Sequence, residues 1–348
     1  MSEWKEYKLG EIVTFQRGHD LPKDKMIDGD IPVAGSNGII GYHNQFTKEG
    51  PGVTIGRSGN IGIPHYYPNA YWAHNTVLYI IDFKGNDTKF MYYLLKTFDF
   101  TQLNTGSAVP SLNRNHIHEL PVSIPELPTQ HRIASILSSL DDKIDLLHRE
   151  NKTLEAMAET LFRQWFIEEA KEDWKEVLLE EIAYLSAGGD KPKNVSSNRT
   201  NELNIPIYSN GIEDEGLYGY TDTPKITEES VTISARGTIG YVVLRTEPFV
   251  PIVRLITLTP KKNITSKYLY FWAKSQDING TGTTQQQLTI PDFKLTKVLL
   301  PEKEFISKFT NEVDKYYEKI LLNKKQIQTL IQQRDSLLPK LMSGEVKI

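Results

Sequence analysis

The sequence has no cysteine, which excludes disulfide bonds and metal sites built from thiolates. It has no apolar run near the roughly 18 residues that a membrane-spanning helix needs. Its first residues do not combine a basic region with an apolar stretch, so they do not resemble an export signal. From these absences we expect a cytoplasmic protein with no membrane partner.

Two dipeptides that mark common catalytic motifs are also missing. Without Pro-Pro there is no Asn/Asp-Pro-Pro-Tyr motif of adenine methyltransferases, and without Gly-Lys there is no P-loop. Asp141-Asp142-Lys143 and Asp292-Phe293-Lys294 match a short piece of nuclease sites, but such triplets recur by chance. His116 and His118 have no further ligands nearby, which favours a surface pair over a metal site. We predict no catalytic residue, no metal site and no cofactor of the chain's own.

The net charge of −4 argues against binding nucleic acid by bulk electrostatics. Residues 1–128 carry 11 basic and 13 acidic side chains, and residues 174–301 carry 14 of each. The stretch 129–173 has 6 basic and 10 acidic side chains, and 302–348 has 9 and 7, so no segment is a basic tail. Any contact with DNA has to come from a local face, or from a partner that supplies the positive channel.

The sequence contains two similar copies of one pattern of segments. The segments keep the same order in both copies, at offsets that vary between 170 and 178 positions. The copies differ by short loop insertions, and the repeat is too long for a solenoid of small units. The matching pieces are Trp4-Lys5-Glu6 with Trp174-Lys175-Glu176, Ile31-Pro32-Val33 with Ile205-Pro206-Ile207, Ser36-Asn37-Gly38-Ile39 with Ser209-Asn210-Gly211-Ile212, Val53-Thr54-Ile55 with Val231-Thr232-Ile233, and residues 88–96 with residues 266–274. Two similar modules in one chain indicate a target that is itself bipartite.

The first 128 residues of each copy combine short β-branched and aromatic runs with glycine and proline. The runs 52–55, 76–81 and 250–259 predict strands with tight turns between them. Residues 88–96 and 266–274 predict one short helix per copy, each opened by a hydroxyl residue suited to N-capping. We therefore expect an α+β (mixed α/β) fold, with domains at 1–128 and 173–301.

After each domain the sequence changes, and mostly apolar residues recur at alternating spacings of four and three positions. This spacing predicts the contact stripe of two long helices, at 129–172 and 302–348, with a length of roughly 50 Å. Each stripe contains one asparagine, and an antiparallel pairing that sets Asn151 beside Asn323 also matches the apolar positions along both helices. The stripes are Ile133, Leu137, Leu140, Ile144, Leu147, Asn151, Leu154, Ala158, Leu161 and Trp165, and Phe309, Val313, Tyr316, Ile320, Asn323, Ile327, Leu330, Arg334, Leu337 and Leu341.

Glycine-rich turns with an arginine follow strand-like runs in both copies, at 57–62 and 235–240. Glycines let a backbone approach a phosphate or base edge, and arginine can make a bidentate contact there; the alternative is a hairpin turn with a solvated arginine. A polar segment at 113–116 corresponds to Gln285-Gln286-Gln287, and asparagine and glutamine are the usual readers of adenine. Two readers of different sequences would differ in this way, although drift of exposed loops predicts the same difference. The candidate DNA-binding residues are Arg17, Ser36, Asn37, Arg57, Ser58, Asn60, Asn113, Arg114, Asn115, Ser209, Asn210, Arg236, Thr238, Gln285, Gln286 and Gln287.

The assembled pattern resembles the specificity (S) subunit of type I restriction–modification systems over essentially the whole chain. The residues that carry the resemblance are Trp4–Ile12 (Trp-Lys-x-x-x-Leu-Gly-Glu-Ile), Arg236–Gly240 (Arg-Gly-x-Ile-Gly, from an Arg-x-Gly-x-Ile-Gly turn), Leu112-Asn113 before Leu120-Pro121-Val122, Gln130-His131-Arg132-Ile133-Ala134-Ser135-Ile136-Leu137, Leu140-Asp141-Asp142-Lys143-Ile144, and Leu161-Phe162-Arg163-Gln164-Trp165-Phe166. The second turn departs from the pattern by placing its arginine at Arg236, whereas the first turn has Arg57 one position earlier, aligned with Ala235.

The resemblance implies two target-recognition domains, separated by two long antiparallel coiled-coil helices and related by a pseudo-two-fold repeat. It implies one half of a bipartite double-stranded DNA site read per domain, two methyltransferase (M) subunits docked on the helices, and restriction (R) subunits that join through that core. S-adenosylmethionine, ATP and Mg would be bound by those partners. A specificity component of a bifunctional type II system remains open, as do a self-sufficient enzyme on a duplicated scaffold and a coiled-coil protein that binds only other proteins.

Overall fold

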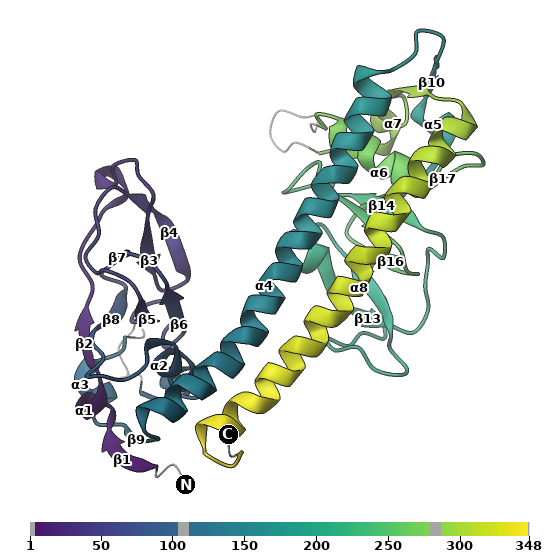
Figure 1. The fold of residues 1–348 in the computed structure, drawn as a ribbon. Helices are drawn as coiled ribbons and strands as arrows, with labels where there is room; N and C mark the ends of the chain where they lie inside the picture. Colours follow the sequence, from purple (N-terminus) through teal and green to yellow (C-terminus); the bar gives the residue numbers. More distant parts are fainter. Residues whose placement is uncertain (1–3, 104–110, 279–286, 347) are drawn as a thin grey trace. The chain divides into compact units, whose positions relative to one another are not determined.

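The computed structural model describes residues 4–103, 111–278, 287–346 and 348, and these residues divide into two compact units. The first unit consists of Met1–His148 with Lys324–Ile348, and the second unit of Arg149–Asn323. Each unit contains one β-rich body and one half of each of the two long helices, α4 (Leu127–Arg163) and α8 (Lys303–Met342) (Figure 1). Residues far apart in the sequence therefore share one core.

The body of the first unit is built from short strands with three short α-helices. In chain order its elements are β1 (Lys5–Lys8), α1 (Leu9–Ile12), β2 (Thr14–Arg17), the 3₁₀ turn η1 (Lys23–Lys25), β3 (Ile31–Gly35), β4 (Gly38–His43), β5 (Gly52–Gly56), β6 (Pro64–Tyr67), β7 (Trp72–Ala73), β8 (Val77–Asp82), α2 (Thr88–Leu95), the 3₁₀ turn η2 (Phe100–Leu103), α3 (Arg114–His118) and β9 (Pro121–Ile124).

The strands and α-helices in the body of the second unit repeat this order, whereas the 3₁₀ turns do not. Its elements are β10 (Lys175–Leu178), α5 (Leu179–Ile182), β11 (Ala183–Ala187), β12 (Ile205–Tyr208), the 3₁₀ turn η4 (Glu213–Gly216), β13 (Leu217–Thr221), β14 (Ser230–Ile233), β15 (Val242–Arg245), β16 (Val250–Pro251), β17 (Ile256–Pro260), α6 (Ser266–Ser275), α7 (Ile290–Phe293) and β18 (Lys297–Leu300). Between the bodies in the sequence, α4 ends in the π-helical turn η3 (Gln164–Glu168).

The sheets of the two units have the same strand order. The four-stranded sheets are β2-β8-β5-β6 and β11-β17-β14-β15, and the three-stranded sheets are β4-β3-β7 and β13-β12-β16. A two-stranded ribbon joins the first strand to the last in each body, β1 to β9 and β10 to β18. The α+β fold and the internal repeat expected from the sequence are confirmed.

The centre of each body is a strand that is buried on both faces and covered by one helix. All residues of β5 and β14 are buried, which explains their run of β-branched residues without polar alternation. Helices α2 and α6 contribute Phe90, Met91, Leu269 and Phe271 to the same cores. The capping prediction was wrong by one position, because Asp87 and Thr265, rather than the hydroxyl residues after them, accept the first backbone N–H groups.

The predicted strand at 250–259 is interrupted. It forms β16 and β17, joined by a turn in which Val253 and Arg254 have the left-handed φ values 51° and 58°. The backbone N–H groups of these two residues donate to the carbonyls of Gly189 and Gly188, so contacts with a distant loop hold the turn. The β-branched residues around a turn without glycine gave no sequence signal for this break.

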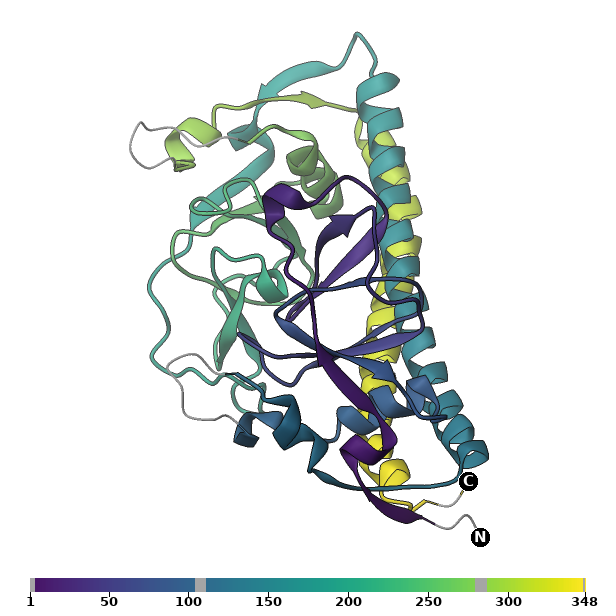
Figure 2. The same cartoon turned by 90° about the vertical axis from the view of Figure 1, so that its left-hand side faces the viewer.

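Helices α4 and α8 lie side by side within each unit (Figures 1 and 2). In the first unit, Leu137 shares a core with Leu337, and Ile144 clusters with Ile327 and Leu330. Residues further along α4 therefore contact residues earlier along α8, so the two helices are antiparallel. The polar stripe residue Arg334 is neutralised by Asp141, with a distance of 2.8 Å between Nη1 and Oδ1.

The antiparallel packing continues in the second unit, where Leu161 and Val313 share a core. Asn323 is fully buried, and its Nδ2 donates to Oδ1 of Asn151 at 2.9 Å and to Oε2 of Glu150 at 3.0 Å. Oδ1 of Asn323 is buried without a hydrogen-bond partner in the described chain. A buried amide pair of this kind penalises any shift of one helix along the other, because a shift would set an asparagine against a leucine or isoleucine.

Candidate nucleic-acid interface

Four loops meet at one end of the β-rich body of the second unit. They are 188–191, 209–211, 235–240 and 252–255, and we call this end the second tip. Asn210 joins three of them, because its Oδ1 accepts the N–H of Ala235 at 3.0 Å and its Nδ2 donates to the carbonyl of Val253. The N–H of Val253 donates to the carbonyl of Gly189 at 3.1 Å, which adds the fourth loop. The predicted glycine-rich turn is therefore one wall of a compact loop cluster.

The corresponding loops of the first unit, 17–20, 36–38, 57–62 and 74–76, form the first tip. Here Ser36 takes the joining role, because its Oγ lies 2.6 Å from the carbonyl of Ser58 and 3.3 Å from that of Thr76. The N–H of Arg57 donates to the same Thr76 carbonyl at 2.8 Å. The two copies use different side chains for one structural task, which leaves the outward residues of each tip free to differ.

A fifth segment closes each tip through one backbone hydrogen bond. The N–H of Leu112 donates to the carbonyl of Arg57 at 2.9 Å, and the N–H of Leu288 donates to that of Ala235 at 3.1 Å. Ser111 and Gln287, the residues directly before the two leucines, are thereby set beside the glycine-rich turns. Sequence positions roughly fifty residues apart thus contribute to one surface in each unit.

The first tip carries two arginines, Arg17 and Arg57. Partial burial, together with the charge of Arg17, lowers the pKa of Arg57 below its ordinary value. Within the described part of the chain neither arginine forms an ion pair with an acidic side chain. Two cations that interact with each other and form no ion pair among the described residues are suited to an anion such as a phosphate, or to the acceptor-rich edge of guanine.

The second tip carries Arg236 and Arg254, and the side chain of Lys225 reaches it from a neighbouring segment. Nε of Arg236 donates to Oε1 of Gln287 at 3.0 Å, so the guanidinium is supported by the closing segment. Arg254 is exposed on the left-handed turn. The amino group of Lys225 lies beside Gly189, since its Nζ would be 3.4 Å from a Cβ added to that glycine. A local positive face therefore exists on a body that is close to neutral overall.

The predicted amide readers are partly used for structure. The side chain of Asn210 is occupied in joining loops, and Oδ1 of Asn113 accepts the N–H of Asn115 as the N-cap of α3. Nε2 of His118 accepts the N–H of Phe15 at 3.0 Å, which accounts for this histidine without a metal. Hydrogen bonds within the fold account for the polar side chains of Asn210, Asn113 and His118, so no contact with DNA is needed to explain them.

The other predicted residues are placed as follows. Asn37 and Asn60 are exposed and Ser58 is half-buried at the first tip, and Arg114 and Asn115 are exposed on α3. Ser209 is half-buried beside Gly216, and Oγ1 of Thr238 is buried without a partner among the described residues. Gln285 and Gln286 lie outside the described residues. Lys225 and Arg254 were not predicted, and Arg254 stood inside the expected strand 250–259.

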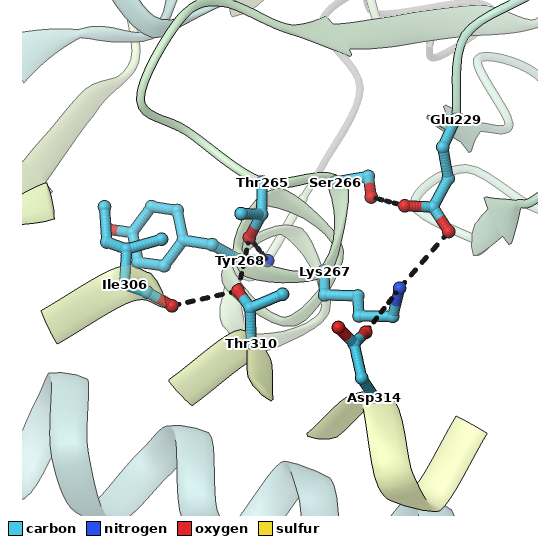
Figure 3. A network of polar contacts seen from close by, with 8 residues as sticks. All are labelled: Glu229, Thr265, Ser266, Lys267, Tyr268, Ile306, Thr310 and Asp314. Carbon is cyan, nitrogen blue, oxygen red and sulfur yellow. Dashed lines mark hydrogen bonds and ion pairs between the residues drawn. The ribbon is translucent and has the colours of Figure 1, made fainter. Parts of the chain in front are cut away.

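A polar network fixes the body of the second unit to α8 (Figure 3). Nζ of Lys267, at the start of α6, lies 2.9 Å from Oδ1 of Asp314 on α8 and 3.3 Å from Oε1 of Glu229. Only 12% of the Lys267 side chain is exposed. Burial alone would lower the Lys267 pKa, but the hydrogen bonds and charges of the two carboxylates outweigh it, and the pKa is raised.

Hydroxyl groups extend this network beside the ion pairs. Ser266 donates to Glu229, and Thr265 lies 2.8 Å from Thr310 between their hydroxyl oxygens (Figure 3). Thr310 donates its own proton to the carbonyl of Ile306, so the shared proton comes from Thr265. The network ties α6, and with it the sheet that carries the second tip, to one face of α8.

The described residues lack a metal-binding cluster and a membrane-spanning helix. Among the described residues, no three histidine or carboxylate side chains are grouped so that they could hold a metal ion. The same part of the chain contains no helix with the length and apolar character needed to cross a membrane.

The histidines predict an acid response confined to one unit. All eight lie within residues 1–148, so the second unit has none. Burial lowers the pKa of His65, His74 and His118, and the charges of nearby Arg114 and Lys84 add to the effect at His118. Between these lowered values and about 6.5, the folded unit binds fewer protons than the unfolded chain. We expect its free energy of unfolding to be constant above about pH 6.5 and to fall as the pH decreases further.

Pulse proteolysis in urea, with peptides assigned to each unit by mass spectrometry, measures this effect. His118→Gln should make the first unit less sensitive to acid, because a glutamine oxygen can accept the N–H of Phe15 at any pH. His148→Gln, at an exposed position on α4, is the matched control and should leave the pH dependence unchanged. Equal acid sensitivity of the two units would contradict the prediction.

Comparison with known proteins gives one family. A model described as "Type I restriction modification DNA specificity domain" matches residues 1–156 and 171–333. The chain is 29% identical to one proposed type I specificity subunit of Mycoplasma pneumoniae, covering 92% of this chain and 94% of that protein. It is 22% identical to the type I restriction enzyme HindI specificity subunit of Haemophilus influenzae, covering 99% and 100%.

One solved structure shares the fold. The crystal structure of a type I restriction–modification system S subunit from M. genitalium matches with a TM-score of 0.65, covering 98% of this chain and 96% of that one. At 20% sequence identity this likeness concerns the fold. The arrangement of two β-rich bodies with two long packed helices is therefore shared with that protein.

Proposed function

The chain belongs to the type I restriction–modification DNA specificity family, and on that premise we propose that each tip reads one half of a bipartite DNA site. Members of this family are non-catalytic and confer specificity, and the chain is a DNA specificity subunit of a type I restriction–modification system. Residues 1–128 and 173–301 would be the two target-recognition domains, with the first tip in one and the second tip in the other. Stretches 129–172 and 302–348 would be the helices that connect them.

The observation that carries the proposal is the local charge at the tips. Arginines and a lysine gather there on chain segments that are far apart in sequence, while the chain as a whole has a net charge of −4. Such a subunit gains little from bulk attraction to DNA, so its specificity has to come from base contacts, while partners supply most of the backbone contacts. Glycines at 59 and 237 allow the backbone of each turn to approach the duplex closely, since both have positive φ values and open surroundings.

The long helices would carry the methyltransferase subunits. Away from the contact stripe, their outer surface exposes large apolar side chains that a lone helix pair would not need: Leu146, Met157, Leu321 and Leu322 are 48%, 46%, 54% and 59% exposed. Exposed apolar groups on such a surface favour a protein partner. We propose that two M subunits cover them, that R subunits join through this core, and that S-adenosylmethionine, ATP and Mg are bound by these partners.

Exchange of one domain tests whether each domain reads its own half-site independently of the other. The chain in which residues 174–301 come from a relative should, together with its M partner, methylate a site with a new second half and an unchanged first half. The chain without the partner should show no methylation, cleavage or ATP hydrolysis. Sequencing that detects methylated bases gives the motif directly. A change in both halves after the exchange, or turnover by the purified chain alone, would refute the proposal.

A further inference from the structure

Arg236 is oriented by a side chain from another loop before any ligand is present. Its Nε is 3.0 Å from Oε1 of Gln287. The neighbouring residues, Ala235 and Leu288, are joined by a backbone hydrogen bond from the N–H of Leu288 to the carbonyl of Ala235. Arg236 is exposed and Gln287 is half-buried. The glutamine therefore holds the Nε side of an arginine that is exposed as a whole.

This support leaves a defined pair of donors. With Nε occupied by Gln287, the guanidinium presents Nη1 and Nη2, for which the described residues offer no hydrogen-bond partner. Two parallel N–H donors in one plane match O6 and N7 of guanine in the major groove. We propose that Arg236 reads a guanine in the second half-site, and that Gln287 is a positioning residue for this contact. The inference rests on the proposed function, because it concerns the same tip.

A base edge explains the support better than a phosphate does. A phosphate accepts hydrogen bonds from many directions, so a fixed orientation of the guanidinium gains little there, whereas guanine offers its two acceptors in one plane. Restricting the arginine also lowers the entropy that ordering it on DNA would cost. Arg254 and Lys225, on neighbouring loops and without such support, are placed to meet phosphates instead.

The first unit lacks this device. Ser58 and Ser111 stand where Arg236 and Gln287 stand in the second unit, and they meet through an isolated backbone bridge. A serine hydroxyl is shorter and selects less strongly among bases. Readout of a guanine by a glutamine-supported arginine should therefore be confined to the second half-site. Substitution of Arg236 should leave the first half-site unchanged, which makes that half-site an internal control.

The test uses the full chain with its M partner and a pool of DNA sites randomised at the bound motif. Selection by binding, and separately by methylation, gives the preference at each position. Arg236→Lys should reduce the preference for one guanine in the second half-site by roughly 5- to 150-fold. Gln287→Met should reduce the same preference, and Gln287→Glu should retain more of it because an acceptor for Nε remains. Arg199→Lys, at an exposed arginine paired with Glu247, is the control and should leave the motif unchanged.

The outcomes separate the two proposals. An unchanged motif in Arg236→Lys, or a uniform loss of binding to all sequences with a weaker salt dependence, would overturn the guanine contact and leave the specificity function intact. A first half-site that changes with Arg236 would also overturn it. If the unaltered chain selects no bipartite site at all, the proposed function itself fails.

Discussion

Removal of residues 324–348 is expected to unfold the first unit, although its β-rich body lies some two hundred positions earlier in the sequence. The carboxy-terminal half of α8 completes the first core, where Leu341 and Met342 are 1% and 7% exposed among residues such as Leu9 and Leu137. Loss of each large buried side chain costs about 2–5 kcal/mol. The sum is comparable with the whole stability of a domain, about 5–15 kcal/mol.

The second unit should survive the same deletion, because its share of α8 ends at Asn323 and its core residues Phe309 and Val313 remain. Hydrogen exchange followed by mass spectrometry should show lost protection in β2, β5 and β8 and retained protection in β14 and β17.

Matched point variants control for the deletion. Leu341→Ala should lower the free energy of unfolding of the first unit by about 2–5 kcal/mol, whereas Leu322→Ala, at a 59% exposed position of the same helix, should change it by less than about 0.5 kcal/mol. Unchanged protection of the first unit after the deletion would show that α8 contributes no core to it.

The helices could be predicted in detail because their apolar residues are periodic and the asparagine in each stripe gives an independent test of the register. Two stripes with one asparagine each allow few antiparallel registers, and the structure has Asn151 beside Asn323 with Ile144 near Leu330. The sheets could be predicted only as a class. Short strands of two to six residues give the same alternation whichever neighbour they pair with, so the division into four-stranded and three-stranded sheets depends on tertiary packing.

The loops of the tips could be found from the repeat, but the tasks of their residues could not. The Ser-Asn-Gly segments and glycine-rich turns do converge, as Asn210 and Ser36 make plain. A polar side chain that joins loops has the same sequence signature as one that faces a ligand, because both lie near the surface and both need hydrogen bonds. Lys225 and Arg254 became visible only when folding brought their loops together.

The most deeply buried cation of the second unit is Arg245 on β15. Only 3% of its side chain is exposed, and its guanidinium carbon lies 3.5 Å from the ring centre of Tyr208. Nε donates to Oγ1 of Thr232 at 3.0 Å, and Nη2 donates to the carbonyl of Glu215 at 2.6 Å. Burial lowers the pKa of Arg245 from its ordinary value, and the nearby Tyr208 and Glu215 oppose that shift.

Arg245 supports a loop that would otherwise be unfavourable. Asp214 and Glu215 both have left-handed φ values, 46° and 56°, and such residues persist only where surrounding contacts hold them. The carbonyl that Arg245 binds belongs to this loop, and the loop continues from Asn210, the residue that joins the second tip. Stability and the geometry of the tip are thus linked through one buried side chain.

Arg245→Met should lower the free energy of unfolding of the second unit by about 3–5 kcal/mol, since it removes charged hydrogen bonds and a desolvated cation–π contact while keeping much of the apolar volume. The first unit should be unaffected, because all partners of Arg245 lie in the second. Arg199→Met is the matched control: Arg199 pairs with Glu247 on the same body but is 55% exposed, and its loss should cost less than about 1 kcal/mol. Urea denaturation resolved by pulse proteolysis measures each unit separately. Equal effects of the two substitutions would mean that burial of Arg245 contributes nothing beyond an ordinary surface pair, and that the left-handed loop before the second tip is held by other contacts.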